Sequence, residues 1–304
     1  MRKLLNFSLL VVAFVWIASL SSCKKDKDDN TLSRFYYSNY DASTVGKVDL
    51  TISPISATAL FEYSDGITGS PEGLTLTKNG YLIAAEENGN RIIKMKKDGT
   101  GTVTVLYDDA DGVSSPTAIA VDNSTGKIYW CNSGTGHIMK GSTDGADTPV
   151  KMYNSAVVID YAYGIAVDHS GGMLYFCDFD GYISAGKLDG TGTPTQIWTK
   201  TNSSMSTPSN IALDTQDKMI YWTDENNSSV TVGKMDGSGT PVVLYDSSDG
   251  ISRADGIFID KVSGMVYWTE TNNDVVARAS LDGSGTREVI VTGLESYCIV
   301  PEIQ

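Results

Sequence analysis

A four-residue stretch that recurs along the chain decides the fold. Its clearest copies are Tyr221-Trp222-Thr223-Asp224 and Tyr267-Trp268-Thr269-Glu270. Four looser copies keep two aromatic or apolar residues followed by a small residue and a polar one: Tyr36-Tyr37-Ser38-Asn39, Ile83-Ala84-Ala85-Glu86, Tyr129-Trp130-Cys131-Asn132 and Tyr175-Phe176-Cys177-Asp178. Successive copies lie 46 residues apart, with one step of 47. A fixed period of this length indicates an array of equal structural units.

Two further signatures flank this stretch. Short, mostly apolar runs precede the later copies at 73–76, 119–122, 165–168, 211–214 and 257–260. Asp-Gly pairs follow, beginning at Asp98, Asp144, Asp189, Asp236 and Asp282. Because glycine accepts the positive φ of tight turns, these pairs predict hairpins. Each unit therefore holds about four short strands, which is typical of a propeller blade.

The two ends of the chain predict how the array closes. Residues 34–63 supply only the last three strands of a blade, and Cys298–Pro301 can supply the missing first strand. Pairing the two ends removes the exposed sheet edges of an open array. We therefore expect an all-β fold, a six-bladed β-propeller with four antiparallel strands per blade, as one domain over residues 34–304.

The motifs resemble the YWTD repeats (LDL-receptor class B repeats) of LDL-receptor-like proteins, and the resemblance covers residues 34–301. It implies that the last motif residue ties neighbouring blades together through hydrogen bonds. This structural role would fall to Asn39, Glu86, Asn132, Asp178, Asp224 and Glu270. We expect the repeated aromatic residues to form the core between blades. The sequence has no EGF-like module beside the propeller, so endocytic receptor function is not expected.

The first residues predict export and a lipid anchor. Arg2 and Lys3 precede an apolar run from Leu9 to Ile17, which is too short to span a bilayer and is typical of a signal peptide over residues 1–22. Leu20-Ser21-Ser22-Cys23 resembles a bacterial lipobox, so Cys23 would be acylated; an ordinary signal peptide is the alternative. Residues 23–33 would be a polar tether, either a plain spacer or a surface-export signal. The expected location is the outer membrane or cell surface of a Gram-negative bacterium.

Charge and cysteine content exclude several classes of function. Without residues 1–22, the chain has 21 basic and 37 acidic side chains, a formal charge of −16. Such acidity argues against nucleic acid as a partner. Cys131, Cys177 and Cys298 are odd in number and lack Cys-x-x-Cys spacing, so we expect buried free thiols and no zinc site or disulfide framework. The expected protein is a monomer without a cofactor.

The candidate binding site lies where the loops enter the innermost strands. One position there differs in nearly every blade: it is Glu72, Thr117, Tyr163, Ser209, Asp255 and, on the last strand, Ser296. Arg253 lies nearby. Scaffold positions repeat because each blade packs in the same way, whereas a varying position is free to serve a ligand. We predict a binding site for an extracellular or envelope protein or a glycan; a solvated rim without a ligand is the alternative.

Catalysis and metal binding are weaker hypotheses. His137 and His169 occupy different repeat positions away from the predicted mouth, which argues against a nucleophilic triad. A metal-dependent hydrolase or lactonase resembling the gluconolactonase-type propellers is the alternative function, with Glu72 and Asp255 as metal ligands. Acidic loops at 108–111 and 246–249 make calcium a minor alternative. A purely structural role in the envelope is the third hypothesis.

Overall fold

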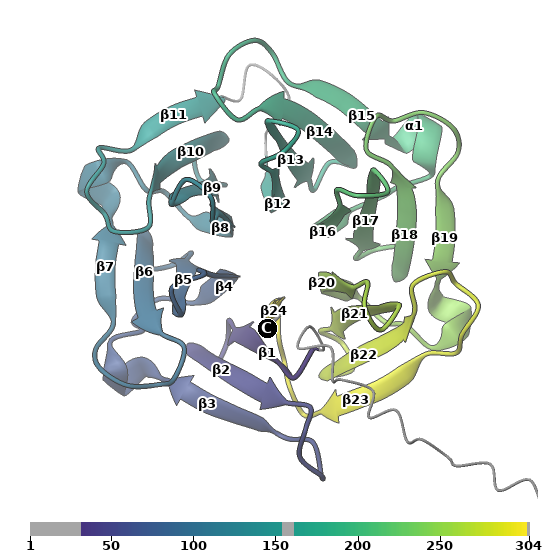
Figure 1. Ribbon diagram of the computed structural model, residues 1–304, viewed down its shortest axis with the longest axis horizontal. Coiled ribbons are helices and arrows are strands. Elements are labelled where there is room, and N and C mark those ends of the chain that lie inside the picture. Colours follow the sequence, from purple (N-terminus) through teal and green to yellow (C-terminus); the bar gives the residue numbers. More distant parts are fainter. Residues whose placement is uncertain (1–31, 154–160, 303–304) are drawn as a thin grey trace, which may run out of the picture.

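The computed structural model describes residues 32–153 and 161–302, which form a ring of six four-stranded antiparallel sheets (Figure 1). The predicted fold class is confirmed. We number the blades 1 to 6 along the chain, with blade 1 made of β24, β1, β2 and β3. Each blade runs from an innermost strand at the centre of the ring to an outermost strand at its rim.

The strands repeat in four classes. The innermost strands are β24 (Cys298–Glu302), β4 (Pro71–Leu76), β8 (Pro116–Asp122), β12 (Ala162–Asp168), β16 (Pro208–Asp214) and β20 (Ala254–Asp260). The second strands carry the four-residue motif: β1 (Arg34–Asn39), β5 (Tyr81–Glu86), β9 (Lys127–Asn132), β13 (Met173–Asp178), β17 (Met219–Asp224) and β21 (Met265–Glu270).

The third strands are β2 (Thr44–Asp49), β6 (Arg91–Lys96), β10 (His137–Ser142), β14 (Tyr182–Lys187), β18 (Ser229–Lys234) and β22 (Val275–Ser280). The outermost strands are β3 (Ala57–Phe61), β7 (Thr104–Tyr107), β11 (Val150–Tyr153), β15 (Thr195–Thr199), β19 (Val242–Tyr245) and β23 (Glu288–Thr292). The one α-helix among the described residues is the single turn α1 (Lys200–Ser203). The described part of the chain contains no helix long and apolar enough to cross a membrane.

Blade 1 closes the ring as predicted. Strand β24 pairs antiparallel with β1, and Ile299 lies opposite Tyr37. The end of β24 is fixed by Glu302, which accepts hydrogen bonds from Arg34 (3.0 Å) and from the Tyr36 hydroxyl (3.0 Å). Since β1 and β24 come from opposite ends of the chain, this sheet holds the ring shut.

The core lies between adjacent blades. Trp130, Trp222 and Trp268 of the motif are fully buried, together with Trp198 of β15. Tyr107 of blade 2 stacks on Trp130 of blade 3 with centroids 5.4 Å apart. Each buried aromatic side chain contributes about 1.5–3 kcal/mol by leaving water, so the repeated aromatics stabilise the contact between blades. The three cysteines of the described residues are buried free thiols.

The last motif residue ties the incoming linker to its own blade. Asp224 accepts hydrogen bonds from the backbone N–H groups of Ser206 (2.6 Å) and Thr207 (3.1 Å), in the linker that arrives from the preceding blade. The same role falls to Glu86, Asn132, Asp178 and Glu270. Blade 1 differs from the expectation: Asn39 accepts from Ala42 within its own turn. Its linker is instead held by the backbone bond from Tyr297 to Ser38.

The opposite face carries a second set of ties between blades. Asp122 contacts His169 Nδ1 (2.9 Å), Asp168 contacts Lys218 Nζ (3.4 Å), and Asp214 contacts Lys261 Nζ (2.6 Å). In each pair the carboxylate ends an innermost strand and its partner side chain comes from the next blade. His169 therefore has a structural contact. The expected signal peptide and Cys23 fall within residues 1–31, outside the described residues.

The closure predicts a specific sensitivity to mutation. Ile299 on β24 and Ile257 on β20 are sixfold-related and almost fully buried. Ile299→Ala should lower the free energy of unfolding by about 2–5 kcal/mol, as much as Ile257→Ala, because the closing strand is packed like any other. Urea unfolding of the two variants measures this. If Ile299→Ala leaves the free energy of unfolding almost unchanged while Ile257→Ala lowers it, the ring is not closed by β24.

Candidate functional site

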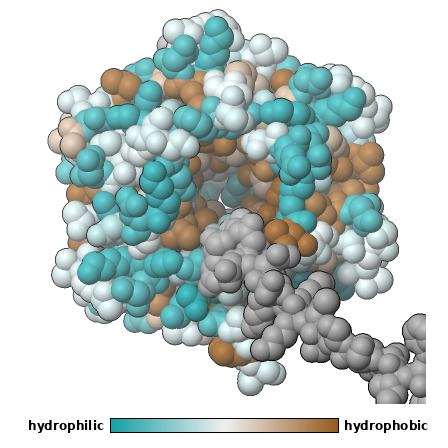
Figure 2. All heavy atoms as spheres, in the orientation of Figure 1, coloured by the Kyte–Doolittle hydropathy of each residue, from teal (hydrophilic) through white to brown (hydrophobic). Residues whose placement is uncertain are grey.

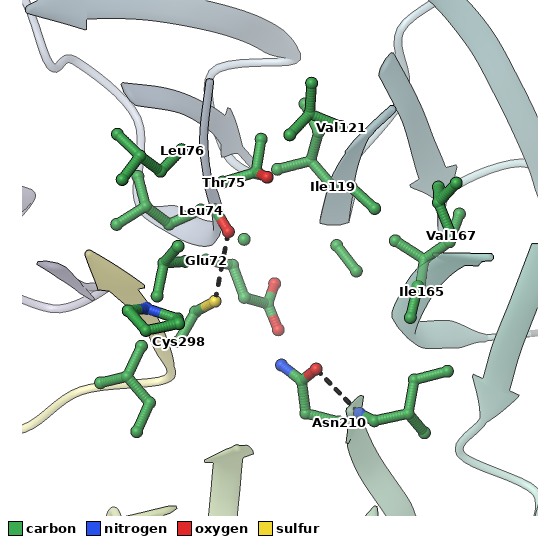
Figure 3. A pocket seen from close by; sticks show the side chains of 18 of the residues that line it. Glu72, Leu74, Thr75, Leu76, Ile119, Val121, Ile165, Val167, Asn210 and Cys298 are labelled. Carbon is green, nitrogen blue, oxygen red and sulfur yellow. Dashed lines mark hydrogen bonds between the residues drawn. The ribbon is translucent and has the colours of Figure 1, made fainter. Parts of the chain in front are cut away.

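The innermost strands surround a central cavity of about 750 Å³. All six run in the same direction, so their first residues gather at one end of the channel, which we call the mouth. Figure 2 shows the channel as a hollow at the centre of the ring with apolar residues on its walls. The middle of the wall is formed by Leu74, Ile119, Val121, Ile165 and Val167, among others (Figure 3). The site is thus a polar mouth above an apolar tube.

Strand register defines the ring of mouth residues. On β20, Ile257 lies opposite Trp268 of the motif, and Asp255 comes two residues earlier. On β24, Ile299 lies opposite Tyr37, so the equivalent residue is Tyr297. The sequence-based choice of Ser296 is therefore wrong by one residue. Tyr297 lines the cavity, while the fully buried Ser296 donates to the Cys298 carbonyl.

Close packing of the innermost strands explains why glycine follows the mouth residue in blades 2 and 6. A Cβ on Gly73 would lie 2.5 Å from the Thr117 carbonyl oxygen of the next blade. A Cβ on Gly256 would lie 2.9 Å from the Tyr297 carbonyl oxygen. No side chain fits at these two positions without moving the backbone. The equivalent residues of the other blades are Ala118, Gly164, Asn210 and Cys298, so the requirement for glycine holds only in particular blades.

Two predicted site residues are used by the fold. The Thr117 hydroxyl, almost fully buried, donates to the Ala162 carbonyl of the next blade at 2.6 Å. The Ser209 hydroxyl donates to the Asp255 carboxylate of the next blade. Both residues line the cavity, but their hydroxyls tie blades together. They are less available to a ligand than the sequence suggested.

Glu72 has no such partner. Its side chain is 9% exposed and reaches into the channel toward the Asn210 side chain (Figure 3). Its Oε2 atom is buried without any hydrogen bond. Burial raises the pKa of the Glu72 carboxyl well above its usual range, and the carboxylates of Glu87, Asp255 and Glu225 raise it further. A buried polar atom without a partner costs free energy and therefore requires an explanation.

Asp255 is a second buried acid at the mouth. Burial raises its pKa to about 7; Glu225 raises it as well, whereas the hydrogen bond from Ser209 and the nearby Arg253 oppose the shift. Arg253 has a positive φ of 56° and lies 3.0 Å from Glu225 (Nε to Oε1) without hydrogen-bond alignment. The positive charge expected near the mouth is thus placed beside Glu225.

Aromatic pairs complete the mouth. The half-buried Tyr163 packs on Phe179 with ring centroids 4.5 Å apart, and Tyr297 packs on Tyr40 at 5.5 Å. Sequence reasoning found Tyr163 but missed Tyr40, Phe179, Glu87 and Glu225. These four share one signal: each directly follows the last residue of the motif. This next position also varies between blades, and Tyr40 and Phe179 contact the mouth residues Tyr297 and Tyr163.

The residues proposed for calcium binding and for catalysis have other positions or contacts. Asp108 accepts from the Ala110 N–H and Asp111 from the Asp108 N–H, and Asp246 and Asp249 repeat this arrangement. These predicted calcium loops are therefore capped turns. Within residues 32–153 and 161–302, no three His, Cys, Asp or Glu side chains are grouped to hold a metal. His137 begins β10, a third strand, and does not line the cavity.

The burial of Asp255 predicts a pH-dependent stability. Its folded pKa of about 7 exceeds the ordinary 3.8, so the folded protein keeps a proton that the unfolded chain loses between about pH 4 and pH 7. Stability therefore falls as the pH rises through this range. Asp255→Asn should raise the free energy of unfolding at pH 8 by up to roughly 4 kcal/mol, at about 1.4 kcal/mol per pKa unit, and change little at pH 4.

Urea unfolding at both pH values measures this effect. The exposed turn variant Asp98→Asn is the control and should show no comparable gain. An Asp255→Asn protein that is no more stable than wild type at pH 8 would show that the Asp255 carboxyl does not have a raised pKa in the folded protein.

Comparisons with known proteins show the fold alone. No family model and no curated protein matches the sequence. A chain in the crystal structure of a nidogen/laminin complex is similar over 88% of this chain and 97% of its own length, with a TM-score of 0.74 and 17% identity. Virginiamycin B lyase from Staphylococcus aureus is similar over 72% of this chain and 69% of its own, with a TM-score of 0.55 and 17% identity. A catalytically inactive histidine-to-alanine form with quinupristin gives a TM-score of 0.56, 16% identity and coverage of 75% and 73%. By fold, the chain is a six-bladed β-propeller similar to that of the nidogen/laminin structure.

Proposed function

We propose that the protein is a non-enzymatic binding module that receives an extracellular or envelope protein or a glycan at the channel mouth. The observation that carries the proposal is the unpaired, buried Glu72 carboxyl in a cavity of about 750 Å³. A fold gains nothing from such a group, whereas a binding site uses it to orient a ligand.

The contrast between scaffold and mouth supports this proposal. Motif residues such as Asp224 and Glu270 make equivalent contacts in their blades. The mouth instead presents two acids, Glu72 and Asp255, and the aromatic residues Tyr163 and Tyr297. The nidogen/laminin neighbour, a chain from a protein–protein complex, favours a protein ligand by analogy of fold.

The enzymatic alternatives find less support. The lyase neighbours include a histidine variant described as catalytically inactive, and neither His137 nor His169 lines the cavity of this chain. A metal-dependent hydrolase would rest on Glu72 and Asp255 alone among the described carboxylates of the cavity mouth. Two buried acids are fewer than the three protein ligands of a catalytic zinc site.

A variant pair tests binding at the mouth. We expect fluorescently labelled protein to bind members of a panel of immobilised glycans and peptides. Tyr163→Ala should weaken each interaction at least tenfold, because an aromatic anchor at a site centre contributes about 2 kcal/mol or more. Tyr63→Ala, on an exposed tyrosine of the rim, is the matched control and should change nothing. Interactions that tolerate Tyr163→Ala would place the ligand elsewhere.

The same proposal includes a lipid anchor at Cys23 and an outer-membrane or surface location. Cells given an alkyne-tagged fatty acid should label the wild-type protein, and Cys23→Ser should abolish the label and release the protein from membranes. Lys25→Ala should retain the label. Labelling that persists in Cys23→Ser would rule out acylation at this residue.

A further inference from the structure

The mouth has more carboxyl groups than basic groups. Glu72 interacts electrostatically with Glu87, Asp255 and Glu225, and the pKa of the half-buried Tyr163 hydroxyl is raised by burial and by these same acids. Arg253 is the cation beside this group, and it contacts Glu225. In a narrow channel with apolar walls, unbalanced charges of one sign focus the potential on the opening. The mouth therefore attracts positive charge.

The unpaired atom of Glu72 indicates where that positive charge would lie. Glu72 Oε2 is buried, has no hydrogen-bond partner and belongs to a side chain that points into the cavity. The backbone carbonyl of Glu72 is already bound by the Ser38 hydroxyl at 2.7 Å, so the residue is held in place while its carboxyl is left free. A donor from outside the protein is the missing partner.

The surroundings define the rest of the ligand. The aromatic pairs Tyr163–Phe179 and Tyr40–Tyr297 are close to the acids of the mouth. Aromatic faces attract cations, most strongly when the cation is partly desolvated. Below Glu72, Leu74 and Ile165 and their neighbours form an apolar wall that accepts a hydrocarbon stem. A charged head on an aliphatic chain matches both parts of the cavity.

We infer that the channel mouth binds an alkylammonium or guanidinium group carried on an apolar stem, with Glu72 and Asp255 as its anionic partners. The inference rests on the proposed binding function and names the chemistry of its ligand. A free aliphatic amine has this chemistry and can place its stem on the apolar wall. A lysine or arginine side chain of a partner protein bound at the mouth shares the charged head.

Two other ligand types fit these observations less well. A calcium ion takes six to eight oxygen ligands, and the described residues offer no group of three or more acids or histidines that could hold a metal. A neutral sugar would donate hydrogen bonds to the carboxyl groups of the mouth but bring no positive charge to pair with them. Only an organic cation both pairs with the Glu72 carboxyl and uses the apolar wall.

Binding of a cation is coupled to proton release. Burial and the nearby Glu87, Asp255 and Glu225 raise the pKa of Glu72. Burial and Glu225 raise the pKa of Asp255, and the hydrogen bond from Ser209 and the charge of Arg253 oppose this rise. A bound cation stabilises the ionised carboxylates, so protons held before binding are released. Affinity should therefore rise between pH 6 and pH 8. A neutral ligand would produce neither effect.

Calorimetric titration of the purified protein tests the inference. The probes are N-acetyl-lysine methylamide, its ε-acetylated form, which lacks the charge, and 1,5-diaminopentane. The lysine probe should bind at least tenfold more tightly than the ε-acetylated form and release protons, which is seen as a buffer-dependent binding enthalpy. Glu72→Gln should weaken the lysine probe by tenfold or more, because it removes one partner of a buried charge pair.

Glu288→Gln, on an exposed acid of the outermost strand β23, should leave the affinity unchanged. Equal binding of the charged and acetylated probes, undiminished binding to Glu72→Gln, or no binding of either amine overturns the inference. The proposed binding function would still hold in that case if the glycan and peptide panel yields neutral ligands whose binding is weakened by Tyr163→Ala. If the inference holds, preference for the lysine probe indicates a protein ligand, and preference for the diamine indicates a free amine.

Discussion

The antiparallel pairing of β24 with β1 is the constraint on which the rest of the molecule depends. Five blades are made from consecutive strands, and only blade 1 joins the two ends of the chain. Without that sheet the ring would expose edges at both ends, and the six innermost strands would not surround a common channel. The burial of Ile299 beside Phe35 and Tyr37 shows that the closing contact is packed like the others.

Closure also explains why the mouth differs from the remainder of the protein. Every blade must pack against its two neighbours in the same way. The chain repeats the same solution, with tryptophan and tyrosine packed between blades and an acid that binds the incoming linker. The first residues of the innermost strands lie at the edge of this packing and line the channel mouth. There the chain places Glu72 and Asp255, whose burial destabilises the fold. A loss of stability that is confined to one end of a regular scaffold is best explained by a function of that end.

Sequence reasoning predicted the fold because it rests on local, repeated signals. The period of 46 residues, the Asp-Gly turns and the missing first strand of blade 1 together define the ring. The site was predicted less completely. Ser296 was chosen instead of Tyr297 because the register of β24 is set by pairing with β1, at the other end of the chain. The use of the Thr117 hydroxyl depends on the position of Ala162 in the next blade, which no local pattern encodes. The acids Glu87 and Glu225 were visible in the repeat, but only the structure shows that they act on Glu72.

The proposed function depends most on one group, the Glu72 carboxyl, which is held without a hydrogen-bond partner in the channel. The most direct measurement is a carbon-13 NMR titration of this carboxyl in protein labelled at glutamate, assigned by comparison with Glu72→Gln. We predict that Glu72 titrates at a pH well above that of an ordinary glutamate and above the exposed glutamates in the same spectrum. If Glu72 titrates together with the exposed glutamates, its carboxyl is hydrated or paired, which contradicts a buried carboxyl without a partner.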